Sequence, residues 1–303
     1  MGKAFARFNC IDSARGLAWL AESVRAGRHC DNDYICLVCD IDLGGYAKQE
    51  GWKPIGSEAV PFVGTFDGCG HMITGLRINR PAKDYQGLFG IVSDSGIVKN
   101  IRLRDSHVVG RDFTGSVAGC VNSGSLRNIG AIGYIHGCHM VGGIVGNSIN
   151  SYLESNRFQG HIVGRNYTGG ISGATWRSNI VNNLNMSSNV KGRDYVGGIT
   201  GSLFGGDLES CRCTGCINGY NFVGGMAGKI GDGNVLGCTV ACSVEGKNMV
   251  GAAGGLACGN NLIENCVFAC SALDGTNYSV NIADQAFTYE PESEAEFYCN
   301  GSK

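Results

Sequence analysis

A seven-residue phrase that returns every 27 or 28 residues constrains this chain more than any other feature of its sequence. Its clearest forms read MVGGIVG, YTGGISG, YVGGITG and FVGGMAG. Successive copies lie 28, 27, 27, 28, 27 and 27 residues apart and begin at Tyr85, Phe113, Met140, Tyr167, Tyr195, Phe222 and Met249. So regular a period predicts a repeat architecture, because one unit cannot bury its apolar face alone and must stack on its neighbours.

The composition favours strands over helices as the building blocks of this repeat. The chain has 50 Gly and 4 Pro among 303 residues, and each interior glycine costs a helix roughly 1 kcal/mol. The unit that spans residues 140–165 contains three short apolar runs bounded by turn residues: MVGGIV, SYLESNRF and GHIVG. Three short strands in about 27 residues predict one coil of a parallel β-helix, with successive coils about 4.8 Å apart.

Charge and hydropathy exclude several classes of partner. The formal net charge is −2, which predicts no bulk attraction to nucleic acid or to an anionic membrane. No run of 18 apolar residues occurs, so we expect no membrane insertion. Residues 1–9 lack the apolar core of a secretory signal. The compartment therefore stays open between the cell surface and the cytoplasm.

The domain plan follows from where the repeat begins and ends. Residues 11–27 place Leu17, Leu20, Ala21 and Val24 on one helical face, with Asp12 or Ser13 as the N-cap and a glycine past the end. We expect residues 1–33 to cap the column with this helix, because an open sheet end would recruit another chain. Residues 34–274 are the predicted β-helix, and the acidic residues 275–303 form a final cap or a tail, all within one structural domain.

The sequence resembles a known repeat family, and the residues that carry the resemblance span about positions 10–275. They are the succession DIDL, W-x-PIG and PF-x-GTFDG-x-GH-x-I-x-GL-x-I, followed by GLFG and the VGGIVG copies. This succession resembles the GLUG-motif β-helices of bacterial surface and adhesin-like proteins and of the non-catalytic region of IgA-specific peptidases. The resemblance implies a right-handed parallel β-helix of bacterial or phage origin, on a cell surface or a phage particle. It implies little about function, because the motif marks a scaffold, and no HExxH occurs in the chain.

Strand alternation predicts that each coil presents one flat, uncharged face. The large-small-large set, such as Tyr167, Gly169 and Ile171, is assigned to the interior, and the intervening residues to the outside. The predicted outward surface for self-association or for a protein partner comprises Thr114, Val141, Val145, Thr168, Ser172, Val196, Thr200, Val223, Ala227 and Val250. The alternative is that small residues here only favour a flat sheet. Ice binding is disfavoured because regular Thr-x-Thr ladders are absent.

A column of basic residues precedes the repeated phrase by two positions and predicts a charged edge. Its members are Lys83, Arg111, Arg165, Arg193 and Lys247. Stacked cations of this kind could hold an acidic or sulfated glycan, although solvated side chains paired with their acidic neighbours are the simpler interpretation. Asp or Asn at the following position suits a tight corner, because these residues tolerate a left-handed backbone.

The 16 cysteines also fall partly into register. Cys211, Cys238 and Cys266 continue a column that begins with Asn156 and Asn183, which predicts a polar ladder that changes into small buried hydrophobes. The coil spacing also allows disulfides, but free buried thiols are favoured. A zinc or iron–sulfur site is disfavoured, because alternation separates the cysteines of Cys36-x-x-Cys39 and of the run from Cys211 to Cys216. We expect no metal and no cofactor.

The sequence favours a non-enzymatic binding scaffold over two alternatives. One alternative is a carbohydrate-active enzyme, such as a polysaccharide lyase or glycosidase, which needs converging carboxylates. The acids available are scattered through the coils: Asp40, Asp42, Asp67, Asp84, Asp112 and Asp194. The histidines have no Ser or Cys partner at a recognisable spacing. The other alternative is an intracellular protein-interaction module. We therefore expect an adhesin-like β-helix without catalytic residues.

Overall fold

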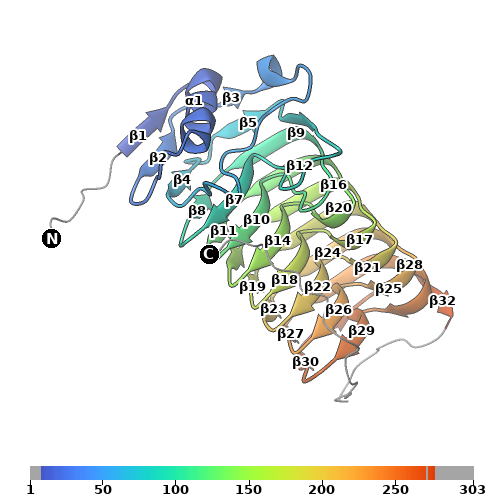
Figure 1. The fold of residues 1–303 in the computed structure, drawn as a ribbon. Helices are drawn as coiled ribbons and strands as arrows, with labels where there is room; N and C mark the ends of the chain where they lie inside the picture. Colours follow the sequence, from blue (N-terminus) through green and yellow to red (C-terminus); the bar gives the residue numbers. More distant parts are fainter. Residues whose placement is uncertain (1–7, 271, 277–303) are drawn as a thin grey trace, which may run out of the picture.

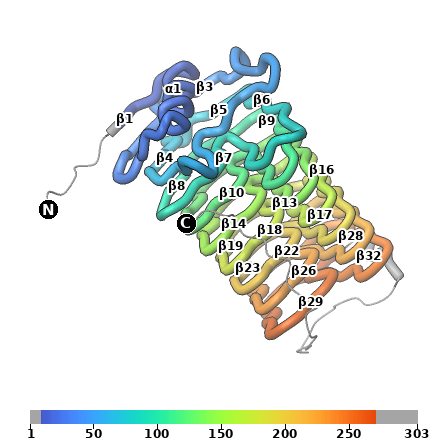
Figure 2. The backbone as a smooth tube through the Cα atoms, viewed as in Figure 1, coloured from blue at the N-terminus to red at the C-terminus, as the bar shows by residue number. Residues whose placement is uncertain are grey.

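The computed structural model describes residues 8–270 and 272–276, and these residues form a parallel β-helix of about ten coils (Figure 1). Three sheets run along the column, with ten, seven and fifteen strands. All pairings between named strands are parallel, which is the pattern of coils laid over one another. Figure 2 shows the backbone descending coil by coil from the N-terminal end. The predicted fold class is confirmed.

From residue 65 onward, the chain contributes strands to the three sheets in turn. The ten-stranded sheet comprises β1 (Phe8–Ile11), β2 (Tyr34–Leu37), β4 (Thr65–Asp67), β8 (Ile97–Lys99), β11 (Ser125–Arg127), β15 (Tyr152–Glu154), β19 (Asn179–Val181), β23 (Asp207–Glu209), β27 (Asn234–Leu236) and β30 (Ile263–Glu264). The seven-stranded sheet comprises β7 (Phe89–Ser93), β10 (Ala118–Asn122), β14 (Val145–Ile149), β18 (Ser172–Trp176), β22 (Thr200–Phe204), β26 (Ala227–Gly231) and β29 (Gly254–Cys258). The fifteen-stranded sheet comprises β3 (Ile41–Asp42), β5 (Met72–Thr74), β6 (Arg77–Asn79), β9 (Arg102–Val109), β12 (Gly130–His136), β13 (His139–Gly142), β16 (Arg157–Val163), β17 (Asn166–Gly169), β20 (Leu184–Lys191), β21 (Asp194–Gly197), β24 (Arg212–Asn218), β25 (Asn221–Gly224), β28 (Thr239–Gly251), β31 (Val267–Phe268) and β32 (Ala272–Thr276).

The predicted N-terminal helix is present as α1 (Ala14–Arg25), the one α-helix among the residues described. Ser13 caps it through a hydrogen bond from the backbone N–H of Gly16, and Gly27 follows its end with φ +98°. The four residues predicted to line its apolar face are buried. A short 3₁₀ helix, η1 (Gly44–Tyr46), lies in the second coil. No helix in the described part of the chain is long and apolar enough to cross a membrane.

The boundary between cap and β-helix differs from the prediction at residue 33. Strand β1 precedes α1 and pairs with β2 in register, with Phe8 opposite Tyr34 and Ile11 opposite Leu37. The sheet therefore begins before the helix, and α1 is inserted between the first two coils. The predicted acidic cap or tail at residues 275–303 lies almost entirely outside the described residues.

The repeated phrase forms a corner between two sheets, not a single strand. In the phrase that begins at Tyr195, β21 ends at Gly197 and β22 begins at Thr200. The last glycine of this phrase, Gly201, is required by space: an added Cβ would lie 2.5 Å from the backbone nitrogen of Thr168 and from the carbonyl carbon of Tyr167. The corner of one coil therefore packs directly on the glycine of the next coil.

A buried ladder of asparagine and cysteine holds another corner. Asn183 accepts from the backbone N–H of Asn156 at 2.9 Å and donates to the carbonyl of Leu153 at 2.8 Å. Farther along the column, the thiol of Cys238 accepts from the backbone N–H of Cys211 at 3.4 Å, and the Cys211 thiol donates to a carbonyl at 3.2 Å. The predicted register is confirmed, but the cysteines keep the hydrogen-bond pattern of asparagine and are more than small hydrophobes.

Candidate functional site

The first residue of the repeated phrase is partly exposed in six of its seven copies, contrary to the sequence prediction, whereas Met140 is buried. Phe113, Tyr167, Tyr195 and Phe222 are partly exposed, although alternation assigned them to the interior. Each has a positive φ, between 55° and 57°. A left-handed residue interrupts the regular alternation of a strand, so the ring turns outward while the following residue turns inward. Ile144, Ile171 and Ile199, the other large members of the set, are buried as predicted.

The outward rings stack on one another along the column. Tyr167 and Tyr195 lie with ring centroids 4.8 Å apart and an interplanar angle of 4°, and Tyr195 and Phe222 lie 4.7 Å apart at 7°. Tyr85 and Phe113 form a second stack at 4.6 Å and 9°. Their separations equal the coil spacing, which confirms that equivalent residues of the repeat are vertical neighbours. We call this column the aromatic ladder.

The same change of orientation places the predicted flat face inside the molecule. Its ten residues are buried, nine of them with no exposed area and Val250 with 7%. Val141, Val196 and Val223 belong to the hydrophobic core. The predicted outward orientation is therefore wrong, and these side chains offer no surface to a partner. These residues are uncharged because they lie in the interior of the coil, and not because they form a docking surface.

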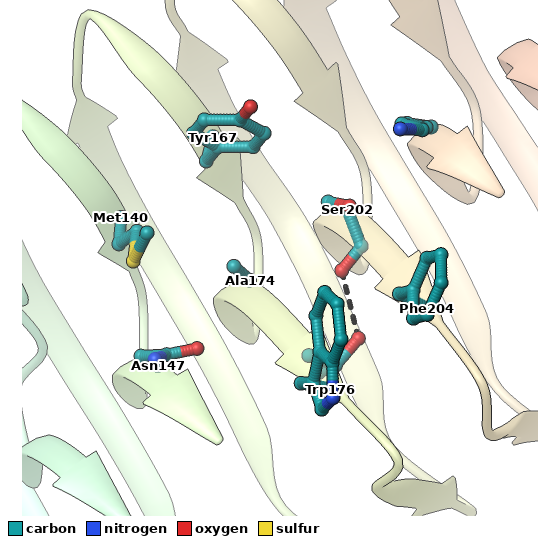
Figure 3. A pocket seen from close by; sticks show the side chains of 9 residues that line it. Met140, Asn147, Tyr167, Ala174, Trp176, Ser202 and Phe204 are labelled. Atoms are coloured by element: carbon teal, nitrogen blue, oxygen red, sulfur yellow. Dashed lines mark hydrogen bonds between the residues drawn. The ribbon is translucent and has the colours of Figure 1, made fainter. Parts of the chain in front are cut away.

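An open groove runs between the aromatic ladder and a second pair of stacked rings. Trp176 of β18 and Phe204 of β22 lie with ring centroids 4.2 Å apart. Figure 3 shows these rings on one side of the groove, and Tyr167 with Met140 on the other. The hollow has a volume of about 80 Å³. We call it the aromatic groove.

The sequence contained a signal for this second ring pair that the prediction missed. Trp176 and Phe204 each follow a ladder tyrosine, Tyr167 or Tyr195, by nine residues. This nine-residue separation indicates a second column of exposed rings only once the ladder residues are known to face outward.

The floor of the aromatic groove carries polar side chains in three of four successive coils. Asn147, Ala174, Ser202 and Lys229 are register partners on β14, β18, β22 and β26, and Figure 3 shows the first three between the two sets of rings. Burial raises the pKa of the Tyr167 phenol to about 12, so this hydroxyl is protonated at neutral pH. Two stacked aromatic walls with a few donors and acceptors between them have the chemistry to hold a flat or ring-shaped polar molecule.

The predicted basic edge is a physical column on the surface. All five of its side chains are exposed. Backbone hydrogen bonds connect the corner residues coil by coil, as from Arg165 to Cys138 at 2.7 Å and from Arg193 to Arg165 at 2.7 Å. Arg111 forms an ion pair with Asp84, and Lys247 lies 2.9 Å from the hydroxyl of Tyr220. Each residue of the edge precedes the first residue of its repeated phrase by two positions, so the edge lies beside the aromatic ladder; Cys138 and Tyr220 take this position in the other two coils.

The acids considered for catalysis are dispersed, and Asp67 is structural. Its carboxylate accepts from the Tyr34 hydroxyl at 2.5 Å, from the Asn100 amide at 3.0 Å and from the Cys69 backbone N–H at 2.8 Å. Lys99 lies 3.3 Å away. Burial alone would raise the pKa of Asp67, but these hydrogen bonds and the cation outweigh burial and lower the pKa to about 2. Asp84 is paired with Arg111.

Asp67 should make the stability of the fold depend on pH between about 4 and 2. Its pKa is lower in the folded chain than its unfolded value, so its contribution is complete above about pH 4 and is lost as the pH falls toward 2. The shift corresponds to about 2 kcal/mol. Urea unfolding of the native chain and of Asp67→Asn across this range should converge at low pH and differ by about 2 kcal/mol at pH 7. A constant difference would contradict this assignment.

The cysteines in the described part of the chain form no disulfides. The fifteen cysteines among the described residues are free thiols. The closest sulfur pairs, Cys10 with Cys36 and Cys213 with Cys242, are each 3.5 Å apart. Hydrogen bonding and burial raise the pKa of Cys238 to about 12, so its thiol is protonated at neutral pH. Within residues 8–270 and 272–276, no three His, Cys, Asp or Glu side chains come together as a metal site.

Comparisons with known proteins show the fold and leave the function open. A putative immunoglobulin A1 protease from Bacteroides ovatus superimposes with a TM-score of 0.58 over 91% of this chain and 80% of that one, at 20% identity. Halomucin from Haloquadratum walsbyi is 34% identical over 134 residues, 41% of this chain. A putative Gly-rich membrane protein from Evansella cellulosilytica is 43% identical over 74 residues, 24% of this chain.

The matched segments cover 2% of halomucin and 9% of the Evansella protein. No family model matches the chain. The expectation drawn from the IgA-specific peptidases is supported at the level of architecture, because the solved neighbour of that description shares the β-helix. The chain is thus a parallel β-helix similar to that of a putative immunoglobulin A1 protease.

Proposed function

We propose that this chain is a non-enzymatic binding module that holds carbohydrate in the aromatic groove. The observation that carries the proposal is the pair of parallel ring columns, Tyr167 with Tyr195 and Trp176 with Phe204, on either side of a polar floor. The faces of sugar rings are rich in C–H groups and stack on aromatic rings, while their hydroxyls require hydrogen-bond partners. Asn147, Ser202 and Lys229 supply such partners.

The shape of the groove favours a chain over a single sugar. Equivalent side chains repeat at each coil, so binding positions recur about every 4.8 Å along the column. A polymer laid along this axis would meet the same chemistry several times, and weak contacts would add up. This arrangement suits an adhesin-like role, which we propose in the sense of the GLUG-type surface proteins that the sequence resembles. The groove lining contains no carboxylate, which supports binding over glycoside hydrolysis at this place.

The proposal is tested with oligosaccharides and the intrinsic fluorescence of Trp176. The full chain is titrated with the hexaoses of cellulose, chitin, xylan and mannan, and tryptophan emission and calorimetry are recorded. We expect at least one hexaose to bind and Tyr167→Ala with Trp176→Ala to weaken it by at least about tenfold, or about 1.4 kcal/mol.

Trp19→Ala is the matched control for the groove variants. Trp19 lies on α1 with 60% of its area exposed and is remote from the groove. This variant should bind like the native chain. If none of the four hexaoses binds, or if the groove variant binds as tightly as the control, the carbohydrate assignment is wrong.

A hollow at the N-terminal end is where the enzymatic alternative would have its acids. Asp31, Asp33 and Asp94 line it together with His29. Asp33 is already paired with Arg28 at 2.5 Å, which leaves Asp31 and Asp94 as its other acids. The enzymatic alternative would be established if the native chain hydrolysed any of the four hexaoses and the variant Asp31→Asn with Asp94→Asn did not. Unchanged hexaoses after long incubation are the expected result.

A further inference from the structure

A second hollow, on the fifteen-stranded sheet, is lined by three arginines. It has a volume of about 280 Å³, and Arg102, Arg104 and Arg157 project from β9 and β16 into its lining. Gln159 adds an amide, and no carboxylate is among the lining residues. We call it the arginine groove. These residues were not predicted as a site from the sequence.

Two of the arginines, Arg102 and Arg157, occupy alternate coils of a single column, and Arg104 lies beside Arg102 on β9. Arg102 and Arg157 are both register partners of Gly130 in the strand between them. The column continues through Leu184 to Arg212. Guanidinium groups therefore recur at roughly 9.6 Å, twice the coil spacing of about 4.8 Å. An ideal Cβ on Gly130 would meet nothing within 4 Å, so the coil between the first two arginines leaves an open notch.

The charges of the arginine groove are available to a ligand. The three arginines are exposed, and none forms an ion pair with another described residue. Asp40 is the carboxylate that attracts Arg102 electrostatically. It already accepts a hydrogen bond from the Met72 backbone N–H at 2.9 Å and lies 3.3 Å from His71. Exposed apolar side chains border the same hollow: Ile132 has 42% and Met186 44% of its area in solvent. Cations beside apolar surface fit an anion that also has a C–H face.

We propose that the arginine groove binds a linear acidic polysaccharide with one anionic group per disaccharide. An arginine fork pairs bidentately with a carboxylate or a sulfate, and the guanidinium spacing is close to the length of a disaccharide. The neutral sugar between two acidic ones would lie over Gly130. Nucleic acid fits less well, because duplex DNA carries a charge about every 1.7 Å and this column offers a cation only at every second coil. This second site is independent of the aromatic groove.

The test uses acidic oligosaccharides that differ in the type and spacing of their charges. The full chain is titrated with octasaccharides of hyaluronan, with one carboxylate per disaccharide, and of chondroitin 4-sulfate, which adds a sulfate. Carboxyl-reduced hyaluronan is the neutral control, and a polygalacturonate octamer carries one carboxylate on each sugar. We expect hyaluronan to bind at least tenfold more tightly than its reduced form. Equal binding of the two would overturn the proposal, as would exclusive binding of polygalacturonate. Tighter binding of chondroitin 4-sulfate than of hyaluronan would identify sulfate as the preferred anion.

Two kinds of variant locate the ligand. Arg102→Gln with Arg157→Gln should weaken hyaluronan binding by at least tenfold, and Gly130→Leu should do the same by filling the notch without any change of charge. Arg165→Gln with Arg193→Gln removes two equivalent charges from the basic edge and should leave the affinity unchanged. If the edge variant loses binding and the groove variant keeps it, the polysaccharide lies on the edge and the groove assignment is wrong. Tyr167→Ala with Trp176→Ala should leave hyaluronan binding unchanged. The binding of acidic octasaccharides in the arginine groove can therefore fail or succeed independently of the binding of neutral hexaoses in the aromatic groove.

Discussion

Val196→Lys should destabilise the β-helix by more than about 4 kcal/mol, because it places an ammonium group in the core without a counter-ion. Val196 has no exposed area, and its register partners are Thr168 and Val223. Its Cγ2 methyl group would lie 2.7 Å from a Cβ placed on Gly192 and 2.9 Å from one placed on Gly219, so the space around this methyl group is closed. Thermal and urea unfolding of the variant should show a much earlier transition than the native chain, or none.

The pH dependence of this variant separates charge from steric overlap. A buried lysine has a pKa far below its unfolded value of about 10.4, so the charge penalty is full at low pH and fades as the pH approaches that value. The variant should therefore recover part of its stability near pH 10. Val38→Lys is the control, since Val38 is 49% exposed and should tolerate the change. A Val196→Lys protein with native stability and altered mass in solution would instead restore the flat face as a contact surface.

Asn183→Leu should cost about 2–4 kcal/mol, because it removes three hydrogen bonds of a buried amide and leaves the Asn156 backbone N–H without the oxygen that accepts from it. The Asn183 side chain has no exposed area. It accepts from the backbone N–H of Asn156 and donates to the carbonyls of Leu153 and Val181, at distances of 2.8 to 2.9 Å. Leucine is close in size but can form none of these bonds. Urea unfolding measures the loss.

Asn183→Cys is the matched comparison within the same column. Cys211 and Cys238 show that a thiol at this place accepts from the neighbouring coil's N–H and donates to a carbonyl. The cysteine variant should therefore lose less than about 1.5 kcal/mol, the usual worth of one hydrogen bond. Equal losses for leucine and cysteine would show that the thiols of this column contribute no hydrogen bonding. The column would then be the stack of small hydrophobes that the sequence predicted.

The two proposed binding grooves lie on different sides of the same column. The aromatic groove follows the seven-stranded sheet, and the arginine groove lies on the fifteen-stranded sheet. Both use the property that defines a β-helix, namely that a residue at one position of the repeat recurs at a fixed interval in space. Ligands that are themselves repeating polymers match that property, which is the physical reason for favouring polysaccharides over small molecules on this scaffold.

The fold and the vertical register could both be predicted from repeating patterns in the sequence. The period of 27 or 28 residues predicted that Tyr167, Tyr195 and Phe222 stack, and helix capping and periodicity predicted α1 with its buried face. Both depend on local patterns that repeat along the chain. The sequence also identified the Asn183 and Cys211 column, because register needs only counting.

The tertiary structure alone decided which side of each strand faces inward. Alternation predicts orientation only while every residue keeps an extended backbone, and the left-handed corner at Tyr195, with φ 56°, reverses it. Because of this left-handed torsion, Val196 faces the core and the ring of Tyr195 faces the surface, the reverse of the predicted orientation. The grooves depend on it in turn, because Trp176 and Arg157 acquire their neighbours only after the coils are wound and stacked.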